Sequence, residues 1–260
     1  MKNKFAKLLN SVSKRFGYRF TKIQNRDWHD DFVGLSDFEK KALEIASKYS
    51  MTGFERMFFL IKALRQIQID DVEGDFVECG VWRGGNLILF QKMIEKLNFN
   101  NRKIFAYDTF SGMSQPGKED SNINNESAEK ILNLLKKKKV DPEKNIIFAK
   151  CNLEDVKKNF EMNTENNDNL ICIKGEVENT LKIDENLPTK ISLLRLDTDW
   201  YESTKIELEV LFPLLSKNGI LIIDDYGYWK GSKKAVDEYF KDKNINLFKI
   251  DFTSRYLFKR

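Results

Sequence analysis

The stretch ISLLRLDTDWYEST, residues 191–204, decides the fold class together with a second stretch, NGILIIDDYGYW, residues 218–229. Each contains a short apolar run with little polar alternation, which is typical of a strand buried on both faces. Each run stops at acidic residues, which are Asp197 and Asp199 in the first stretch and Asp224 and Asp225 in the second. A segment of helical length, residues 203–216, separates the runs, so the sequence predicts a strand–helix–strand unit whose two strands are parallel.

The four aspartates are expected to lie close together. Parallel strands end at the same edge of a sheet, and neighbouring strands lie about 4.8 Å apart. Carboxylates packed this closely repel one another unless a cation neutralises them, and a divalent cation with oxygen ligands is the natural candidate. The alternative for each aspartate is a solvated strand end, but four of them on two neighbouring strands favour an active site.

Length and composition are those of an ordinary globular protein. At 260 residues, with 41% hydrophobic and 32% charged residues, the chain is long enough for one large α/β domain. No apolar run approaches the roughly 18 residues of a membrane span, and the N-terminus lacks the apolar segment of a signal peptide. The three cysteines, Cys79, Cys151 and Cys172, form no C-x-x-C pair, which favours reduced thiols in a cytoplasmic protein.

Positive charge is concentrated at the N-terminus. The first 26 residues carry eight lysines and arginines and no acidic residue, so the remaining chain has a formal charge of −4 although the whole chain is at +4. Nucleic-acid binding is therefore not indicated. Apolar residues at nearly helical spacing predict that residues 1–44 form a basic arm with a helical extension, ahead of a single domain, residues 45–260. The arm could pack on the domain, form a homo-oligomer contact or lie on an anionic membrane surface.

A glycine-rich turn, residues 80–85, joins a short strand, residues 76–79, to a helix that is predicted to begin at Asn86. Glycine permits a tight turn, and the start of a helix offers free N–H groups to a ligand. The spacing is G-x-x-x-G-G, unlike the G-x-G-x-x-G of dinucleotide-binding proteins. The next strand, residues 103–107, ends at Asp108, which is suited to hold the two hydroxyls of a ribose. Together these features indicate a nucleotide-like ligand.

The rest of the chain continues the α/β pattern. Short strands are predicted at residues 146–149 and, as a third core strand, at residues 170–173. Residues 245–250 and 254–259 alternate in hydropathy and are expected to form an antiparallel pair at the edge of the sheet. The polar segment 109–127 is rich in Gly, Ser, Asn and Asp and is expected to cover the site as a lid; the alternative is a surface insertion with no role in the site.

The chain resembles the macrocin O-methyltransferase family (TylF/MycF-type), which belongs to the class I S-adenosylmethionine-dependent methyltransferases. The resemblance covers roughly residues 45–260 and rests on four motifs in the family's order and spacing: VEGDFVECGVWRGG (72–85), FAYDTFSGM (105–113), LRLDTDWYEST (194–204) and GILIIDDYGYWKGSKKAVDEYF (219–240). It implies a Rossmann-like α/β fold, a seven-stranded and mostly parallel sheet with helices on both faces and an antiparallel last strand.

The resemblance also implies sites for S-adenosylmethionine and Mg²⁺. It places Glu78, Gly80, Gly84 and Gly85 at the methionine part of the cofactor and Asp108 at its ribose. It places Ser111 and Gly175 near the adenosine. It places Thr52 and Arg56 in a segment that folds over the cofactor. It assigns as magnesium ligands Asp197, Asp224 and Asp225, and as catalytic residues Asp197 and Asp199, the latter as general base.

Two residues next to the predicted metal ligands depart from the family pattern. Relatives often have glycine at the position of Thr198 and a smaller apolar residue at that of Trp200. These changes leave the ligands intact and border the expected acceptor pocket, so they put any specific acceptor in doubt.

The predicted function is S-adenosylmethionine- and Mg²⁺-dependent methylation of a sugar hydroxyl in a glycoside, a nucleotide sugar or a surface-glycan precursor. Mg²⁺ would lower the high pKa of such a hydroxyl, and Asp199 would take its proton. Two alternatives stay open. A nicotinamide-dependent oxidoreductase is disfavoured by the G-x-x-x-G-G spacing, and a non-catalytic cofactor-binding subunit would be expected to have lost some of the aspartates.

Overall fold

The computed structural model describes residues 32–99, 101–138 and 148–260. Contacts divide the chain into two compact units, Met1–Ser36 and Asp37–Arg260, and the second unit contains all the secondary structure considered below. Residues 1–31 of the predicted arm lie outside the described residues, so its role, its boundary at residue 44, and oligomer formation stay predictions. Helix α2 (Asp37–Ser47) runs across that boundary. Within the described residues, every helix is too short or too polar to cross a membrane.

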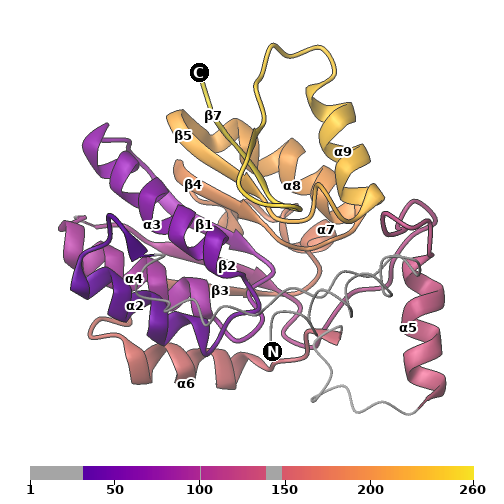
Figure 1. Cartoon of the computed structure of the whole chain (residues 1–260), viewed down its shortest axis with the longest axis horizontal. Helices are drawn as coiled ribbons and strands as arrows, with labels where there is room; N and C mark the ends of the chain where they lie inside the picture. Colours follow the sequence, from indigo (N-terminus) through magenta and orange to yellow (C-terminus); the bar gives the residue numbers. More distant parts are fainter. Residues whose placement is uncertain (1–31, 100, 139–147) are drawn as a thin grey trace, which may run out of the picture. The chain divides into compact units, whose positions relative to one another are not determined.

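A seven-stranded sheet forms the centre of the second unit, which confirms the predicted fold class (Figure 1). Its order is β3-β2-β1-β4-β5-β7-β6, with the first five strands parallel and β7 antiparallel to both of its neighbours. The strands are β1 (Asp75–Cys79), β2 (Ile104–Asp108), β3 (Leu170–Lys174), β4 (Ile191–Leu196), β5 (Leu215–Ile223), β6 (Phe248–Lys249) and β7 (Arg255–Phe258).

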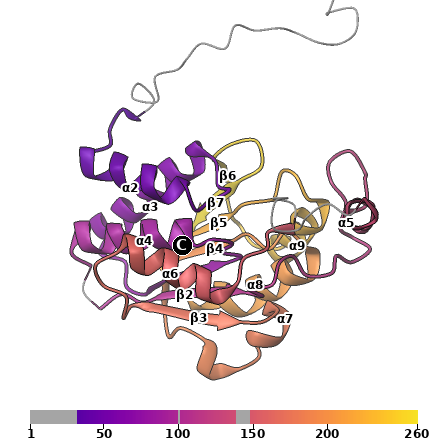
Figure 2. The same ribbon diagram turned by 90° about the horizontal axis from the view of Figure 1, so that it is seen from below.

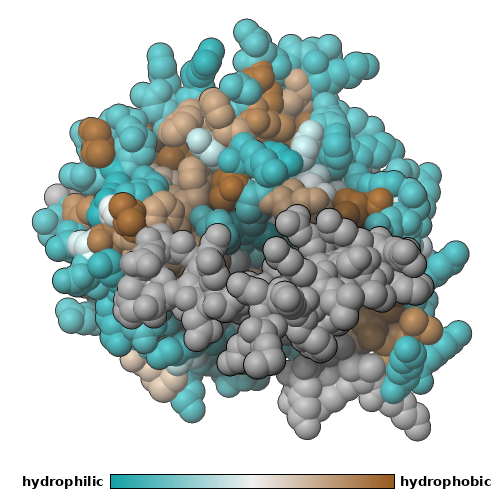
Figure 3. Space-filling model, viewed as in Figure 1, coloured by the Kyte–Doolittle hydropathy of each residue, from teal (hydrophilic) through white to brown (hydrophobic). Residues whose placement is uncertain are grey.

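Helices cover both faces of this sheet, as predicted (Figure 2). On one face lie α2, α3 (Phe54–Ile69) and α4 (Gly85–Leu97), with α6 (Leu153–Asn163) packed on α4. On the other face lie α8 (Tyr201–Leu214), flanked by α7 (Val177–Thr180) and α9 (Lys230–Phe240). Helix α5 (Ala128–Lys137) follows the segment after β2, and a 3₁₀ turn, η4 (Asp184–Asn186), precedes β4. Hydrophilic side chains predominate on the face seen in Figure 3, with apolar residues interspersed among them.

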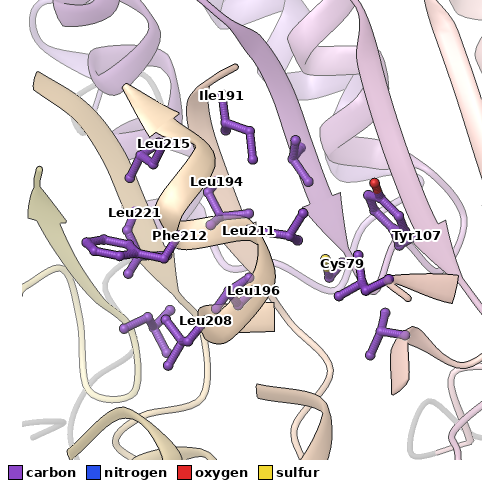
Figure 4. Close-up of a cluster of buried hydrophobic side chains, with 14 of the residues drawn as sticks. Cys79, Tyr107, Ile191, Leu194, Leu196, Leu208, Leu211, Phe212, Leu215 and Leu221 are labelled. Atoms are coloured by element: carbon purple, nitrogen blue, oxygen red, sulfur yellow. The ribbon is translucent and has the colours of Figure 1, made fainter. Parts of the chain in front are cut away.

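The core between β4, β5 and α8 explains the apolar runs of the sequence (Figure 4). Every residue of β4 is buried, because the strand has neighbours on both sides and helices on both faces. Leu194 and Leu221 meet Leu208 and Leu211 of α8 in this core, and burying one such side chain contributes about 1.5–3 kcal/mol. Leu196 pairs with Ile223, so the acidic residues that follow β4 and β5 begin at the same level of the sheet.

Two predicted strands differ from the structure. The strand at residues 170–173 forms as β3, but it is an edge strand with a single neighbour and is only partly buried, so its placement in the core is wrong. An apolar run of this length does not reveal whether one or two neighbours flank it. The strand predicted at residues 146–149 falls half outside the described residues, and Phe148 and Ala149 are not in a strand.

Candidate active site

A cavity of about 380 Å³ lies where β1, β2, β4 and β5 end. This is the edge of an open α/β sheet at which ligands commonly bind. It is lined by most of the residues that the sequence predicted for the site: Thr52, Glu78, Gly80, Asp108, Gly175, Asp197, Asp199, Asp224 and Asp225. Gly84, Gly85 and Ser111 are not among its lining residues. None of these functional assignments is tested by their position alone, and they stay predictions.

The glycines of the turn after β1 allow close packing of the backbone. Gly80 has φ +82°, and a Cβ placed there would lie 2.1 Å from the carbonyl oxygen of Asp197. Glycine is therefore needed where the end of β1 meets the end of β4. A Cβ on Gly85 would lie 2.5 Å from the carbonyl oxygen of Ala46, and the Gly85 N–H donates to Tyr49 (3.0 Å). Gly85 thus fits the start of α4 against the segment that follows α2.

Asp108 organises the same turn through its carboxylate. One oxygen accepts hydrogen bonds from the backbone N–H groups of Val81 (2.8 Å) and Trp82 (3.2 Å). The other accepts from the Phe110 N–H (2.7 Å) and the Thr109 hydroxyl (3.4 Å). Burial raises the pKa of Asp108, while these backbone hydrogen bonds lower it. The predicted ribose partner is thus also the residue that holds the glycine turn against β2, a role that sequence reasoning missed.

Glu78 lines the cavity and has one carboxylate oxygen without a hydrogen-bond partner among the described residues. Its Oε1 accepts from Asn86 Nδ2 (2.8 Å) and from Arg195 Nη1 (2.7 Å). Its Oε2 is buried and has no hydrogen-bond partner within the part of the chain that is described. Burial raises the pKa of Glu78, and the charge of Arg195 opposes that rise. An unpartnered buried carboxylate oxygen is costly, so it marks a place where a ligand with a positive N–H donor fits.

Arg195, near the C-terminal end of β4, links the two halves of the site and was not singled out from the sequence. Its side chain is 2% exposed and donates to Glu78, to Asp197 (2.8 Å) and to Asp224 (2.7 Å). Its Nη2 also donates to the Thr52 hydroxyl (3.1 Å). Burial lowers the pKa of Arg195, but the neighbouring carboxylates raise this pKa by more than burial lowers it, so the guanidinium stays charged. An arginine inside an otherwise apolar strand is the signal that could have found it.

Asp224 is fully engaged by two arginines. Its Oδ1 accepts from Arg195, and its Oδ2 accepts from Arg56 on α3. Arg56 is fixed in turn by Asp251, whose Oδ2 accepts from Nε at 2.6 Å. The sequence predicted Asp224 as a magnesium ligand, and in this structure both of its oxygens already have cationic partners.

The other three aspartates form a compact acidic cluster. Asp197, Asp199 and Asp225 each offer a carboxylate oxygen, and these oxygens lie within 4.8 Å of one another. The Oδ2 of Asp225 is buried without a hydrogen-bond partner in the described ranges. Burial raises the pKa of Asp199 to about 7. Burial also raises the pKa of Asp197 and the pKa of Asp225 well above the usual range. For Asp199 and Asp225, the charges of the neighbouring carboxylates raise the pKa further. Such a group of partly buried carboxylate oxygens suits a hard divalent cation.

The predicted lid, residues 109–127, forms one wall of the cavity and is tied to the helices that follow the acidic turns. Asp120 accepts from the Tyr201 N–H (2.8 Å) at the start of α8, and the Lys230 N–H donates to Ser121 (2.8 Å) at the start of α9. The indole of Trp200 donates to the carbonyl of Ser114 (3.2 Å). An aromatic group adjoins this wall: Trp200 packs edge-on against Trp229 at 5.0 Å, and Tyr228 and Trp229 line the cavity.

Comparison with known proteins identifies the family. A sequence model of Macrocin-O-methyltransferase (TylF) matches residues 39–259. The chain belongs to the macrocin-O-methyltransferase (TylF) family. This member is therefore an S-adenosylmethionine-dependent O-methyltransferase, and the oxidoreductase alternative is set aside.

Relatives of this macrocin-O-methyltransferase family member support the same activity. It is 33% identical over 192 residues to the 8-demethyl-8-(2,3-dimethoxy-alpha-L-rhamnosyl)-tetracenomycin-C 4'-O-methyltransferase of Streptomyces olivaceus, covering 74% of this chain and 67% of the relative. It is 30% identical over 198 residues to the demethyldecarbamoylnovobiocin O-methyltransferase of Streptomyces niveus, covering 75% and 68%. The solved structure of the O-methyltransferase NovP matches with a TM-score of 0.68 and 27% identity over 81% of this chain and 82% of that one.

Proposed function

We propose that this O-methyltransferase methylates a sugar hydroxyl and requires Mg²⁺. The observation that carries the proposal is the acidic cluster of Asp197, Asp199 and Asp225, which faces the same cavity as Glu78 and Asp108. The name of the tetracenomycin relative, which includes a rhamnosyl group, supports a sugar acceptor. A cofactor site and a cation site in one cavity are what methylation of a poorly acidic hydroxyl needs.

S-adenosylmethionine, when bound, supplies an electrophilic methyl group on a sulfonium. The buried Oε2 of Glu78 is placed to accept from the ammonium of its methionine part, because no donor from the described residues occupies it. Asp108 and Gly175 line the cavity beside β2 and β3, where the ribose and adenine would lie. The N–H of Gly175 donates to the carbonyl of Asp108 (3.0 Å), which holds the residue after β3 beside the end of β2.

Asp197 and Asp225 are the proposed magnesium ligands, since both belong to the acidic cluster and to the set implied by the family. The cation supplies positive charge that lowers the pKa of an acceptor hydroxyl. Asp199 is the proposed general base, because its carboxylate lies within the acidic cluster and lines the cavity beside the two proposed ligands. Asp224 is proposed as the weakest metal contributor, since both of its oxygens are held by arginines.

The test is an acceptor screen with mass spectrometry. The purified chain is incubated with S-adenosylmethionine and Mg²⁺, and with a rhamnoside, a nucleoside-diphosphate deoxysugar or catechol as acceptor. We expect a methylated sugar product that disappears with a chelator and returns when Mg²⁺ is added back. Methylation of catechol alone would contradict the sugar assignment, and sugar methylation that persists in chelator would contradict the metal.

A further inference from the structure

The turn between β4 and α8 holds Asp199 in an unusual backbone conformation. Asp199 has φ +70°, and the Trp200 N–H donates to the carbonyl of Thr198 at 2.9 Å. A hydrogen bond across three residues with a central positive φ defines a γ-turn of the rare, strained kind. A non-glycine residue stays in this conformation only where its surroundings hold it there. The acidic cluster therefore depends on whatever fixes this turn.

The side chain of Thr198 is anchored to the helix behind the turn. Its hydroxyl donates to Oε1 of Glu207 at 2.9 Å. Glu207 lies on the sheet-facing side of α8 with 0% exposure, among residues such as Leu208 and Leu211. Its other oxygen, Oε2, has no hydrogen-bond partner in the described part of the chain. A carboxyl group is costly to bury among apolar side chains, so its retention there needs a reason beyond packing.

We propose that Thr198 and Glu207 are positioning residues, whose hydrogen bond holds the γ-turn so that Asp199 faces Asp197 and Asp225. This inference rests on the proposed metal site, whose carboxylates the Thr198–Glu207 hydrogen bond would hold in place. Thr198 stands between two residues of the cluster, so rotation of its peptide groups would move both carboxylates. Helix α8 and β4 are packed through the buried core, which makes Glu207 a rigid support. Partners behind the ligands of a metal site commonly change metal affinity by about 10–100-fold.

The role proposed for Thr198 depends on its side chain. Glycine at this position would have no side chain to bond to Glu207. The hydroxyl, rather than the volume of the side chain, is what the geometry uses. Valine matches threonine in shape and lacks the hydroxyl, whereas serine keeps the hydroxyl and lacks the methyl group.

The experiment measures binding of Mn²⁺, used as a spectroscopic stand-in for Mg²⁺, by electron paramagnetic resonance titration of the full chain. Thr198→Val is expected to weaken Mn²⁺ binding by about tenfold. Thr198→Ser keeps the hydroxyl and is expected to bind Mn²⁺ as tightly as the parent. Glu207→Gln retains an acceptor oxygen and should bind Mn²⁺ like the parent. Glu207→Leu should bind it as weakly as Thr198→Val. Thermal melts verify that each variant is folded at the temperature of the titration. Calorimetric titration with S-adenosylmethionine should give the same Kd for all variants.

The outcomes separate this inference from the function on which it rests. Mn²⁺ affinity that is unchanged in Thr198→Val and in Glu207→Leu would overturn the positioning role and leave the metal site standing. Failure of the parent chain to bind Mn²⁺ would overturn the metal site and this inference together. Equal losses of Mn²⁺ and S-adenosylmethionine affinity in Thr198→Val would show a general structural role instead, and would overturn the inference.

Discussion

The glycine turn after β1 and the two acidic turns after β4 and β5 border the same cavity but differ in how their charges are satisfied. Asp108, which holds the glycine turn, accepts four hydrogen bonds from the protein itself. Asp225, in the acidic cluster, has a buried oxygen with no partner among the described residues. The first turn is complete as the chain folds, whereas the second holds an excess of negative charge.

This difference indicates that the two sides of the site are built for different ligands. A preformed turn binds a cofactor without having to rearrange, which limits the entropy lost on binding. A cluster of partly buried carboxylates is relieved of its mutual repulsion either by protons or by a cation, so it is suited to bind a divalent cation where the protons have been released. Arg195 contacts residues of both sides and supplies part of the missing positive charge. The predictions below test this division, from the largest expected effect to the smallest.

Substitution Asp225→Asn is expected to have the largest effect. It removes one of the two proposed magnesium ligands that belong both to the acidic cluster and to the set implied by the family. We expect the rate of methyl transfer to fall about a thousandfold, which corresponds to a rise of about 4 kcal/mol in activation free energy. Binding of S-adenosylmethionine should be unchanged. The measurement is the initial rate on a sugar acceptor, with Asp237→Asn on the exposed side of α9 as the control. A rate within a few-fold of the parent would remove Asp225 from the metal site.

Substitution Gly80→Ala should damage both sides at once. The new methyl group would overlap the carbonyl of Asp197, and the positive φ disfavours any residue with a Cβ. We expect a loss of about 2–3 kcal/mol in the free energy of unfolding, measured in urea. Gly117→Ala is the matched control, since its Cβ would lie 3.5 Å from the Asp120 carboxylate, at an ordinary contact distance. Equal stability of the two variants would refute the proposed close packing.

Substitution Asp108→Asn should weaken the cofactor side alone. An amide has one acceptor oxygen, and its NH₂ group would face N–H donors of the turn or of Phe110. We expect the Kd for S-adenosylmethionine to rise about tenfold, which corresponds to about 1.4 kcal/mol, with Mn²⁺ binding retained. Ser111→Ala, at an exposed side chain outside the cavity, should have a smaller effect in the same calorimetric titration. A loss of Mn²⁺ binding in Asp108→Asn would show that the two sides are not independent.

The smallest expected effect is the pH dependence of magnesium stabilisation. The pKa of Asp199 is raised to about 7 in the metal-free chain, whereas an unfolded aspartate titrates near about 3.9. The folded chain therefore binds the extra proton between these values, and its stability without metal falls as the pH rises toward 7. Below pH 7, Mg²⁺ must displace the proton of Asp199 in order to bind, which weakens its binding; above pH 7 that proton is already absent. Mg²⁺ should therefore raise the Tm by about 2–4 °C more at pH 8 than at pH 6.

Thermal melts with and without Mg²⁺ at the two pH values measure this difference. Asp199→Asn cannot hold this proton, so its magnesium effect should change less between pH 6 and pH 8 than that of the parent. If the parent and Asp199→Asn show the same change between the two pH values, the proton of Asp199 is not coupled to the metal.

Much of the fold was determined by the sequence alone. The apolar runs before Asp197 and Asp224 identified two buried parallel strands, and the structure confirms them as neighbours with Leu196 beside Ile223. Such runs are readable because strand burial is a local pattern, repeated over a few consecutive residues. The aspartates were found for the same reason, since they follow directly where each run stops. The seven strands, mostly parallel with an antiparallel last strand, agree with the sheet that the resemblance to the family implied.

Only the tertiary structure decided which partners these residues take. Arg56 reaches Asp224 across 168 positions of sequence. Arg195 joins Glu78, within β1, to Asp197 and Asp224, which follow β4 and β5. Thr198 finds Glu207 only because α8 packs against β4, and β3 becomes an edge strand only through the order of the sheet. A carboxylate in the sequence has the same chemistry whether a cation, an arginine or a backbone N–H will face it. Its partner is set by strand register and helix packing, which no local pattern contains.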